Sequence, residues 1–334
     1  MYCVERKHFI LQNEQDGRFP GSELSILMLK MIGNWLNFSC NYDNRDLKDY
    51  TMEGALVQKI SVDELPKYSP WVARLLGLDS FNRPLRNLAK VDAEYDKDKY
   101  AKLLAYYQGK SGTTVQEVRA QETYTELPVL CVSKKGQLFL TSPDNYLALE
   151  REILIDVLAE PISTATIVIE LGCGYAYNFS ILRDAYPDRV WIGGEYSQNA
   201  IKLASLLFAD CDDISVLSFN WYDDFWPIFE AFEGKALVFT RHSIEQLPRA
   251  ATLLPTFSKY REKITAVVHL EPLYELADKE STLGLMRQAY TLLNDYNTDL
   301  LTAIKAMGVK ILRTQYDLIG GNPLNPTSLV YWRF

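Results

Sequence analysis

Two patterns of apolar and polar positions divide the chain. From residue 1 to about residue 125, apolar side chains recur at helical spacing, as in segments 24–36 and 100–107. From residue 164 onward, short apolar runs alternate with longer amphipathic segments. The run 166–171 is rich in β-branched residues, which is typical of a strand buried on both faces of a parallel sheet. The pattern therefore predicts an α-rich N-terminal region followed by an α/β sheet.

Seven strands are predicted in the second part of the chain. They cover residues 166–171, 190–193, 214–219, 237–240, 265–270, 310–319 and 328–334. Helices fill the gaps, notably at 197–209, so we expect a doubly wound, mostly parallel sheet with helices on both faces. The last two strands flank the turn 320–323 as in a hairpin, so the final strand is expected to run antiparallel at or inside the sheet edge.

The chain is accordingly divided into two regions. Residues 1–144 are expected to be mainly helical, with a β-hairpin near 129–140, and residues 145–334 form the α/β domain. A helical insertion is expected near 273–296, because 298–307 already supplies the helix that precedes the next strand. We expect the N-terminal region and the insertion to cover the carboxyl edge of the sheet as a substrate cap. The alternative for the N-terminal region is a homodimer interface.

Composition narrows the class of protein. The chain has 334 residues, 48% of them hydrophobic, a net charge of −8 and a pI of about 5.1, without a basic patch. A phosphate backbone would be repelled by this charge, so no nucleic-acid partner is expected. The most apolar early stretch, 24–36, is too short for a membrane span and contains Lys30. Charges near the N-terminus and five Cys without a CxxC pair favour a cytoplasmic protein.

The segment that follows the first buried strand carries the strongest chemical signal. It reads Glu170-Leu171-Gly172-Cys173-Gly174, and glycines at this strand-to-helix turn let the backbone approach a nucleotide-like cofactor. The third glycine of a dinucleotide fingerprint is absent. A carboxylate two residues before the first glycine would repel a phosphate but suits a ligand with an amine. Both features argue against a nicotinamide-dependent dehydrogenase, which we keep as an alternative.

This segment resembles motif I (ExGxGxG) of class I S-adenosylmethionine-dependent methyltransferases, with Ala176 at the third glycine position. Glu195, at the end of the second strand, is similar to the acidic residue that binds the ribose hydroxyls in that superfamily. Asn220-Trp221 matches the position where Asp or Asn bonds the adenine amine and an apolar neighbour packs on the ring. The resemblance covers about residues 145–334. It implies the Rossmann-like methyltransferase fold, S-adenosylmethionine as cofactor and S-adenosylhomocysteine (SAH) as product.

The resemblance and the strand ends give a set of cofactor-binding candidates. They are Glu170, Gly172, Cys173, Gly174, Tyr175, Glu195, Tyr196, Asn220, Trp221 and Thr240. Some have simpler interpretations that stay open. Asn220 could cap a strand end, Trp221 could be a core residue, and Cys173 could be a small apolar filler rather than a nucleophile.

Catalytic candidates lie after the fourth and fifth strands, at the carboxyl edge of the sheet. His242 and Glu245 are three residues apart and share a face on a helical turn, while His269 and Glu271 point the same way in an extended strand. An imidazole oriented by a carboxylate is a plausible general base near neutral pH. Either histidine could instead be a structural residue. The four side chains could chemically hold a metal, but none is expected.

We therefore expect a methyltransferase that acts on O or N of a small molecule, sugar or peptide side chain. His242 is the first candidate base and His269 the second. One alternative is an N-methyltransferase that needs no base and holds a cationic acceptor by Glu245 and Glu271. An alternative of another class is a non-catalytic, cofactor-binding scaffold.

Overall fold

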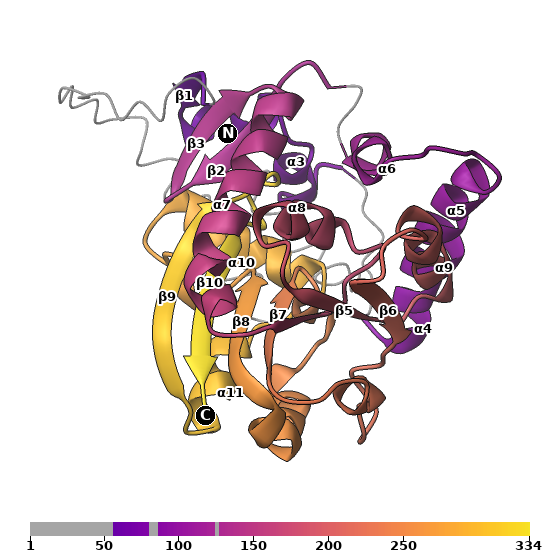
Figure 1. Cartoon of the computed structure of the whole chain (residues 1–334). Helices are drawn as coiled ribbons and strands as arrows, with labels where there is room; N and C mark the ends of the chain where they lie inside the picture. Colours follow the sequence, from indigo (N-terminus) through magenta and orange to yellow (C-terminus); the bar gives the residue numbers. More distant parts are fainter. Residues whose placement is uncertain (1–55, 80–85, 124–126) are drawn as a thin grey trace, which may run out of the picture.

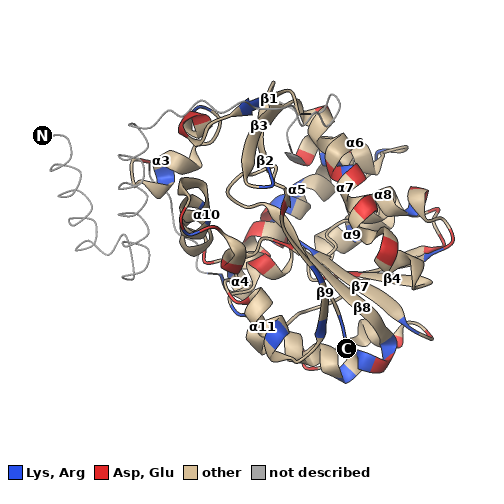
Figure 2. Cartoon of the chain, turned by 90° about the vertical axis from the view of Figure 1, so that its left-hand side faces the viewer, with Lys and Arg blue, Asp and Glu red and all other residues tan. Residues whose placement is uncertain are grey.

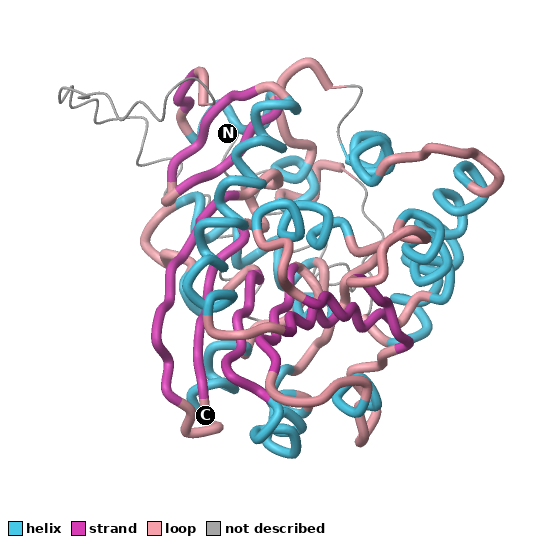
Figure 3. Tube along the Cα trace, in the orientation of Figure 1, coloured by secondary structure: helices cyan, strands magenta, loops and turns pink. Residues whose placement is uncertain are grey.

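The computed structural model describes residues 56–79, 86–123 and 127–334 (Figure 1). The helical stripe predicted at 24–36 lies outside these residues. In the described part, a seven-stranded sheet forms the centre of the molecule and a three-stranded sheet lies at one end of it. Figure 3 shows the strands of the large sheet lying between helices.

The large sheet has the order β6-β5-β4-β7-β8-β10-β9. Strands β4 to β8 are parallel, whereas β10 runs antiparallel to both of its neighbours. The prediction of a mostly parallel seven-stranded sheet with an antiparallel last strand is therefore confirmed. The strands are β4 (Ile167–Leu171), β5 (Val190–Glu195), β6 (Ile214–Ser218), β7 (Ala236–Arg241), β8 (Ile264–Glu271), β9 (Lys310–Ile319) and β10 (Thr327–Arg333).

Helices cover both faces of this sheet, because its central strands are apolar on both sides. Val168 of β4 packs in one buried cluster and the next residue, Ile169, packs in the other. The first face is covered by α7 (Pro143–Ser163), α8 (Tyr177–Ala185) and α9 (Gln198–Leu207). The second face is covered by α11 (Leu300–Ala306) and by the 3-10 helices η3 (Pro227–Glu230), η5 (Ala250–Thr252) and η6 (Leu254–Lys263).

Residues 88–123, here called the cap, are mainly helical. They comprise α4 (Leu88–Val91), the π-helix η2 (Asp92–Tyr100), α5 (Ala101–Tyr107) and α6 (Val115–Thr123). The cap is fixed to the start of α9, where Asp96 accepts hydrogen bonds from the Ser197 hydroxyl and the Asn199 backbone N–H. Figure 1 shows α4 and α5 beside α9 at one end of the large sheet.

The small sheet has the order β1-β3-β2. Strands β2 (Leu130–Lys134) and β3 (Gln137–Thr141) form a hairpin whose turn residues, Lys135 and Gly136, both have positive φ. Strand β1 (Gln58–Ile60) pairs with the outer side of β3. The sequence pattern assigned this stretch to a mainly helical region. Three residues are too few for an alternating pattern to be recognised, so only the pairing identifies the strand.

Helix α10 (Thr282–Leu293) joins the small sheet to the large one. It shares an apolar cluster with residues of β1 and β2 and with the short helices η1 (Val62–Lys67) and α3 (Trp71–Leu75). A buried ion pair of 2.8 Å connects Arg287 of α10 to Asp317 of β9. Between β8 and α10 lies the short 3-10 helix η7 (Tyr274–Leu276).

Charged positions are spread over the described elements. In Figure 2, acidic and basic residues are interspersed along the helices rather than separated onto different elements. No helix in residues 56–79, 86–123 or 127–334 is both long and apolar enough to cross a membrane.

Candidate functional site

Two cavities adjoin at the carboxyl edge of the large sheet. The larger has a volume of about 460 Å³ and the smaller about 120 Å³. Four residues line both of them: Tyr95 and Tyr100 of the cap, Gly172 after β4, and His242 after β7. The cap therefore forms one wall of each cavity, and the strand ends form the opposite wall.

The turn after β4 requires its glycines. Gly172 has φ +79°, and a Cβ at this position would lie 1.9 Å from the Ser243 hydroxyl oxygen. Gly174 has φ +57°, and its N–H donates to Glu195 at 2.8 Å. Ala176, at the third glycine position of the motif, also adopts a positive φ of 63°. The chain thus keeps the motif's backbone conformation there without its glycine.

Glu170 presents an unsatisfied oxygen at the wall of the larger cavity. Its Oε1 accepts a hydrogen bond from Asn178 of α8, whereas its Oε2 is buried and has no partner. Burial raises the pKa of this carboxyl to about 8. A ligand amine would supply the missing donor and favour the charged carboxylate.

Glu195 lines the smaller cavity and is held by the backbone. Its two oxygens accept from the N–H groups of Gly174 and Ser197, at 2.8 and 2.7 Å. Burial raises the pKa of this carboxyl, although these backbone donors oppose the rise. Each carboxylate oxygen can accept more than one hydrogen bond, so the held carboxylate can still accept from two hydroxyls.

The structure brings Tyr196, Asn220 and Trp221 to the smaller cavity as well. Trp221 donates from its indole nitrogen to Ser243 at 3.2 Å, and its ring packs edge-on against aromatic residues of the core. It is therefore both a cavity wall and a core residue. The Asn220 amide accepts from the Tyr222 N–H and donates to the Asp223 carboxylate, so both ends are engaged within its own turn.

Cys173 and Tyr175 lie at the wall of the larger cavity. Burial raises the pKa of the Cys173 thiol well above its usual value, and the residue packs under Gly193. A thiol in these surroundings is an apolar filler rather than a nucleophile. The Tyr175 hydroxyl donates to Glu122 of the cap at 2.6 Å.

His242 stands between the two cavities with φ +49°. Its Nδ1 lies 3.2 Å from Glu245 Oε2, and its Nε2 lies 2.6 Å from the Thr327 hydroxyl. Because a carboxylate only accepts, Nδ1 carries the proton in the neutral ring, and the lone pair of Nε2 accepts a hydrogen bond from the Thr327 hydroxyl. Burial lowers the pKa of His242, but the charges of Glu245 and Glu271 outweigh it and raise the pKa overall.

His269, Thr240 and Glu271 occupy different surroundings from His242. His269 is fully buried among Phe257 and Trp332, its Nδ1 meets the Thr240 hydroxyl at 3.0 Å, and burial lowers its pKa to about 3. Neither His269 nor Thr240 lines a cavity. Both belong to strands, whose side chains point to the faces of the sheet, and His269 packs there against Phe257 and Trp332.

Glu271 acts on the backbone of the neighbouring loop. Its carboxylate accepts from the N–H groups of Ser243, Ile244 and Glu245, at 3.0 to 3.2 Å. It therefore caps the 3-10 helix η4 (Ile244–Gln246) and is absent from both cavity walls. Burial raises the pKa of the Glu271 carboxyl to about 7.

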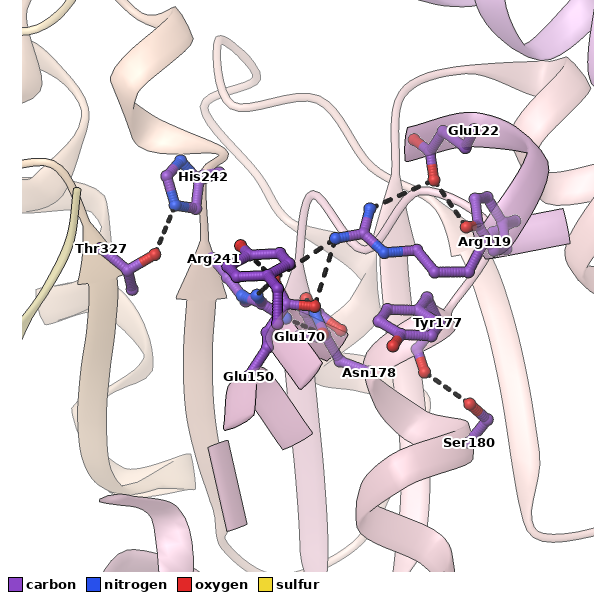
Figure 4. Close-up of polar contacts among 12 residues, drawn as sticks. Arg119, Glu122, Glu150, Glu170, Tyr177, Asn178, Ser180, Arg241, His242 and Thr327 are labelled. Atoms are coloured by element: carbon purple, nitrogen blue, oxygen red, sulfur yellow. Dashed lines mark hydrogen bonds and ion pairs between the residues drawn. The ribbon is translucent and has the colours of Figure 1, made fainter. Parts of the chain in front are cut away.

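A network of ion pairs lines the larger cavity (Figure 4). Glu150 of α7 binds both Arg119 of the cap and Arg241 at the end of β7. Glu122 binds Arg119 and Lys99, which joins the cap helices to each other. Burial opposes ionisation of Glu150, but Arg241 and Arg119 hold the pKa of its carboxyl at about 2. The sequence gives no signal for these contacts, because the partners lie far apart in the chain.

Two amide side chains converge on Glu245. Asn325 Nδ2 donates to its Oε2 at 2.8 Å, and Gln246 Nε2 donates to its Oε1 at 2.9 Å. The carbonyl oxygens of both amides are buried without a partner. Asn325 lines the larger cavity and Gln246 the smaller one. Asn325 could have been found from the sequence, because an antiparallel last strand must begin at the carboxyl edge.

Within the described part of the chain, no three His, Cys, Asp or Glu side chains are grouped so that they could hold a metal ion. Besides the ion-pair network of the larger cavity, the two cavities carry acceptors held by backbone or amide donors, namely Glu170, Glu195 and Glu245. Such an arrangement fits an organic ligand that carries hydroxyl and amine groups.

Comparison with known proteins gives structural matches alone. No protein-family model and no curated protein matches the chain. Magnesium protoporphyrin IX methyltransferase from Synechocystis PCC 6803, solved with SAH, is 12% identical, with a TM-score of 0.40 over 57% of this chain and 85% of its own. Mitomycin 7-O-methyltransferase MmcR is 12% identical, with a TM-score of 0.41 over 73% and 71%. The methyltransferase domain of bacterial CtHen1-CN is 20% identical, with a TM-score of 0.39 over 56% and 100%.

Because the sequence identities and TM-scores of these matches are low, we assign the fold from the order and direction of the strands in the large sheet. Five parallel strands in the order β6-β5-β4-β7-β8 are continued by β10, which is antiparallel and lies inside β9. A glycine turn follows the central strand β4, and an acidic residue ends its neighbour β5. The chain has the Rossmann-like fold of class I methyltransferases.

Proposed function

We propose that the protein is an S-adenosylmethionine-dependent methyltransferase acting on O or N of a small molecule, sugar or peptide side chain. One observation carries the proposal. The glycine turn at Gly172 lies between a cavity with the carboxylate of Glu195 and a cavity with the unpaired oxygen of Glu170. These acceptors correspond to the ribose hydroxyls and the methionine amine of this cofactor.

The residues of the two cavities fit the parts of the cofactor. Glu195 would accept from the ribose hydroxyls, and Glu170 would accept from the methionine amine. Trp221 and Leu247 offer apolar surface to the adenine ring in the smaller cavity. The close approach of Gly172 to Ser243 keeps the loop of β7 against the glycine turn.

The chemistry of the site follows from His242. When bound, S-adenosylmethionine supplies a methyl group on a positively charged sulfur, which is transferred to a nucleophile by displacement. His242 would accept the proton of the nucleophile on Nε2, where the nucleophile would replace the Thr327 hydroxyl as hydrogen-bond donor. Glu245 holds the other ring nitrogen and would stabilise the imidazolium that forms. His269 is not part of this proposal, because it lies in the core.

A second candidate is an N-methyltransferase that needs no base. Asn325 and Glu245 both line the larger cavity, the Asn325 amide nitrogen donates to Glu245, and the Asn325 carbonyl oxygen is buried without a donor. An amine or ammonium group would satisfy this oxygen. Glu271 does not contribute to this alternative, because three backbone N–H groups already occupy its carboxylate.

The test is calorimetric titration with S-adenosylmethionine and SAH, with NAD as the control ligand. We expect micromolar affinity for the first two and no binding of NAD. Glu195→Ala should weaken SAH binding by about 100-fold, because hydrogen bonds to a charged group contribute about 1.5–3 kcal/mol each. Glu233→Ala, at an exposed position, is the matched control. If the wild type binds neither S-adenosylmethionine nor SAH, the proposal is contradicted, and a non-catalytic scaffold becomes the remaining interpretation.

Acceptors can then be identified by the mass increase of one methyl group in a mixture of candidate small molecules, sugars and peptides. The reaction of an acceptor that needs a base should depend on His242. An amine acceptor that reacts equally well with His242→Asn would favour the second candidate.

A further inference from the structure

The carboxylate of Glu245 fixes the orientation of a neighbouring amide. It is buried and accepts from Gln246 Nε2 on one oxygen, and from His242 Nδ1 and Asn325 Nδ2 on the other. A carboxylate has no donor to offer at neutral pH. The reverse amide orientation of Gln246 would place two oxygens against each other. The donor nitrogen of Gln246 must therefore face Glu245.

This orientation leaves the carbonyl oxygen of Gln246 directed away from Glu245. The side chain is only 7% exposed, it lines the smaller cavity, and its Oε1 has no hydrogen-bond partner. Leaving a buried carbonyl oxygen without a donor costs free energy, so a ligand N–H that reaches this oxygen from the adjoining cavity would be stabilised.

Asn220 is the other amide in the wall of the smaller cavity, and it differs from Gln246. Its oxygen accepts from the Tyr222 N–H at 3.1 Å, and its nitrogen donates to Asp223 at 3.0 Å. Both ends of the Asn220 amide are thus used to shape the turn after β6. The sequence resemblance assigns the adenine amine to Asn220, but of these two amides Gln246 is the one whose oxygen has no hydrogen-bond donor at all.

We propose that Gln246 Oε1 accepts the hydrogen bond of the exocyclic adenine amine, and that Glu245 is the positioning residue that holds this oxygen in place. The proposal rests on the proposed function and names a specificity-determining residue of the same site. The site then selects a 6-amino purine, because a 6-oxo purine would set its own carbonyl oxygen against Oε1.

The experiment compares SAH with S-inosylhomocysteine, in which the adenine amine is replaced by a carbonyl oxygen. Calorimetry on the full chain should give a preference for SAH of about 10- to 100-fold, as expected for one unsatisfied buried acceptor. In Gln246→Leu the two affinities should lie within about threefold of each other, because the discriminating oxygen is gone. Gln198→Leu changes an exposed glutamine near the site and should keep the wild-type ratio.

A second variant tests the positioning role. Glu245→Gln removes the charge that fixes the Gln246 amide, so the amide can turn its Nε2 toward a 6-oxo group. The preference for SAH should then fall several-fold or more, while the variant still binds both ligands. A merely structural role would weaken both ligands equally and leave their ratio unchanged. Circular dichroism confirms that each variant is folded.

The outcomes separate the inference from the proposed function. If the wild type binds neither ligand, both fail. If it binds SAH but shows no preference, or if Gln246→Leu retains the preference, the inference is overturned and the proposed function stands. If Asn220→Ala loses the preference for SAH while Gln246→Leu keeps it, the adenine amine is bound by Asn220 instead.

Discussion

The carboxyl edge of the sheet and the cap line the same cavities, but they are held in different ways. At the edge, the carboxylates of Glu195 and Glu271 are fixed by backbone N–H groups of nearby turns. In the cap, Arg119 and Lys99 are fixed by ion pairs with side chains. Backbone contacts depend on a local motif, whereas the ion pairs depend on partners from distant segments. We therefore expect the edge to determine the chemistry and the cap to control which ligands enter the cavities.

The largest effect is expected at the edge. His242→Asn keeps a residue that tolerates the positive φ but removes the base, so turnover with an acceptor that needs a base should fall by about 10²- to 10⁴-fold. In the wild type, turnover should fall at acidic pH with a midpoint above 6.5, because nearby carboxylates raise the pKa of His242. Both are measured as initial rates across pH.

His269→Leu is the matched control for this prediction. Its imidazole is fully buried and lines neither cavity, so turnover should stay within about threefold of the wild type. An equal loss of turnover in both variants would contradict the distinction between the two histidines.

The next effect concerns the attachment of the cap. Glu150→Leu leaves Arg119 and Arg241 in the cavity wall without their common carboxylate, so the free energy of unfolding should fall by about 3 kcal/mol. Urea unfolding measures this change in the free energy of unfolding. The exposed pair Arg151–Asp184 provides the control, because Asp184→Ala should change stability by less than about 0.5 kcal/mol. Similar effects of the two variants would mean that the network does not hold the cap.

The third effect is a pH dependence of stability that is caused by the Glu170 carboxyl. Burial raises the pKa of Glu170 from 4.5 to about 8, so the folded state holds this proton more tightly than the unfolded chain does. The corresponding stability is fully present below pH 4.5 and is lost as the pH rises through about 8. Glu170→Gln should flatten that dependence in urea unfolding measured from pH 5 to 9.

Ligand binding should also move this proton. A ligand amine beside Glu170 favours the carboxylate, so SAH binding near pH 7 should release about one proton. Calorimetry in buffers of different ionisation enthalpy measures the release, which should be absent in Glu170→Gln. Proton uptake by the wild type would contradict the placement of the amine.

The smallest effect is expected where the cap meets α9. Asp96→Ala removes the acceptor for Ser197 and Asn199 and should lower stability by about 1 kcal/mol. SAH affinity should also fall several-fold, because the cap residues Tyr95 and Tyr100 line both cavities. Asp98→Ala, in an exposed pair with Lys102, is the control and should change neither quantity.

The sequence predicted the sheet and the glycine turn after β4, for a local reason. The buried run of β4 and the glycines that follow it fix a strand and a turn within a few residues, and Glu195 ends the next strand. Even the antiparallel direction of β10 follows from a hairpin pattern. These features need no knowledge of distant contacts.

The contacts between the cap and the sheet could not be predicted in the same way. Arg119, Glu150 and Arg241 look like ordinary surface charges in the sequence, and only the folded chain brings them together. The two histidines show the same limit of the sequence, because the pattern places both near strand ends at the same edge of the sheet. His242 lies in a loop with positive φ and faces the cavities, whereas His269 is still inside β8 and faces the core.

The most direct test is a crystal structure of the protein with SAH. We expect the ribose hydroxyls on Glu195 in the smaller cavity and the methionine amine at Glu170 in the larger one, with the part of the ligand between them passing Gly172. Ligand density that lies away from Glu195 and Gly172, or in the larger cavity alone, would contradict the proposed function.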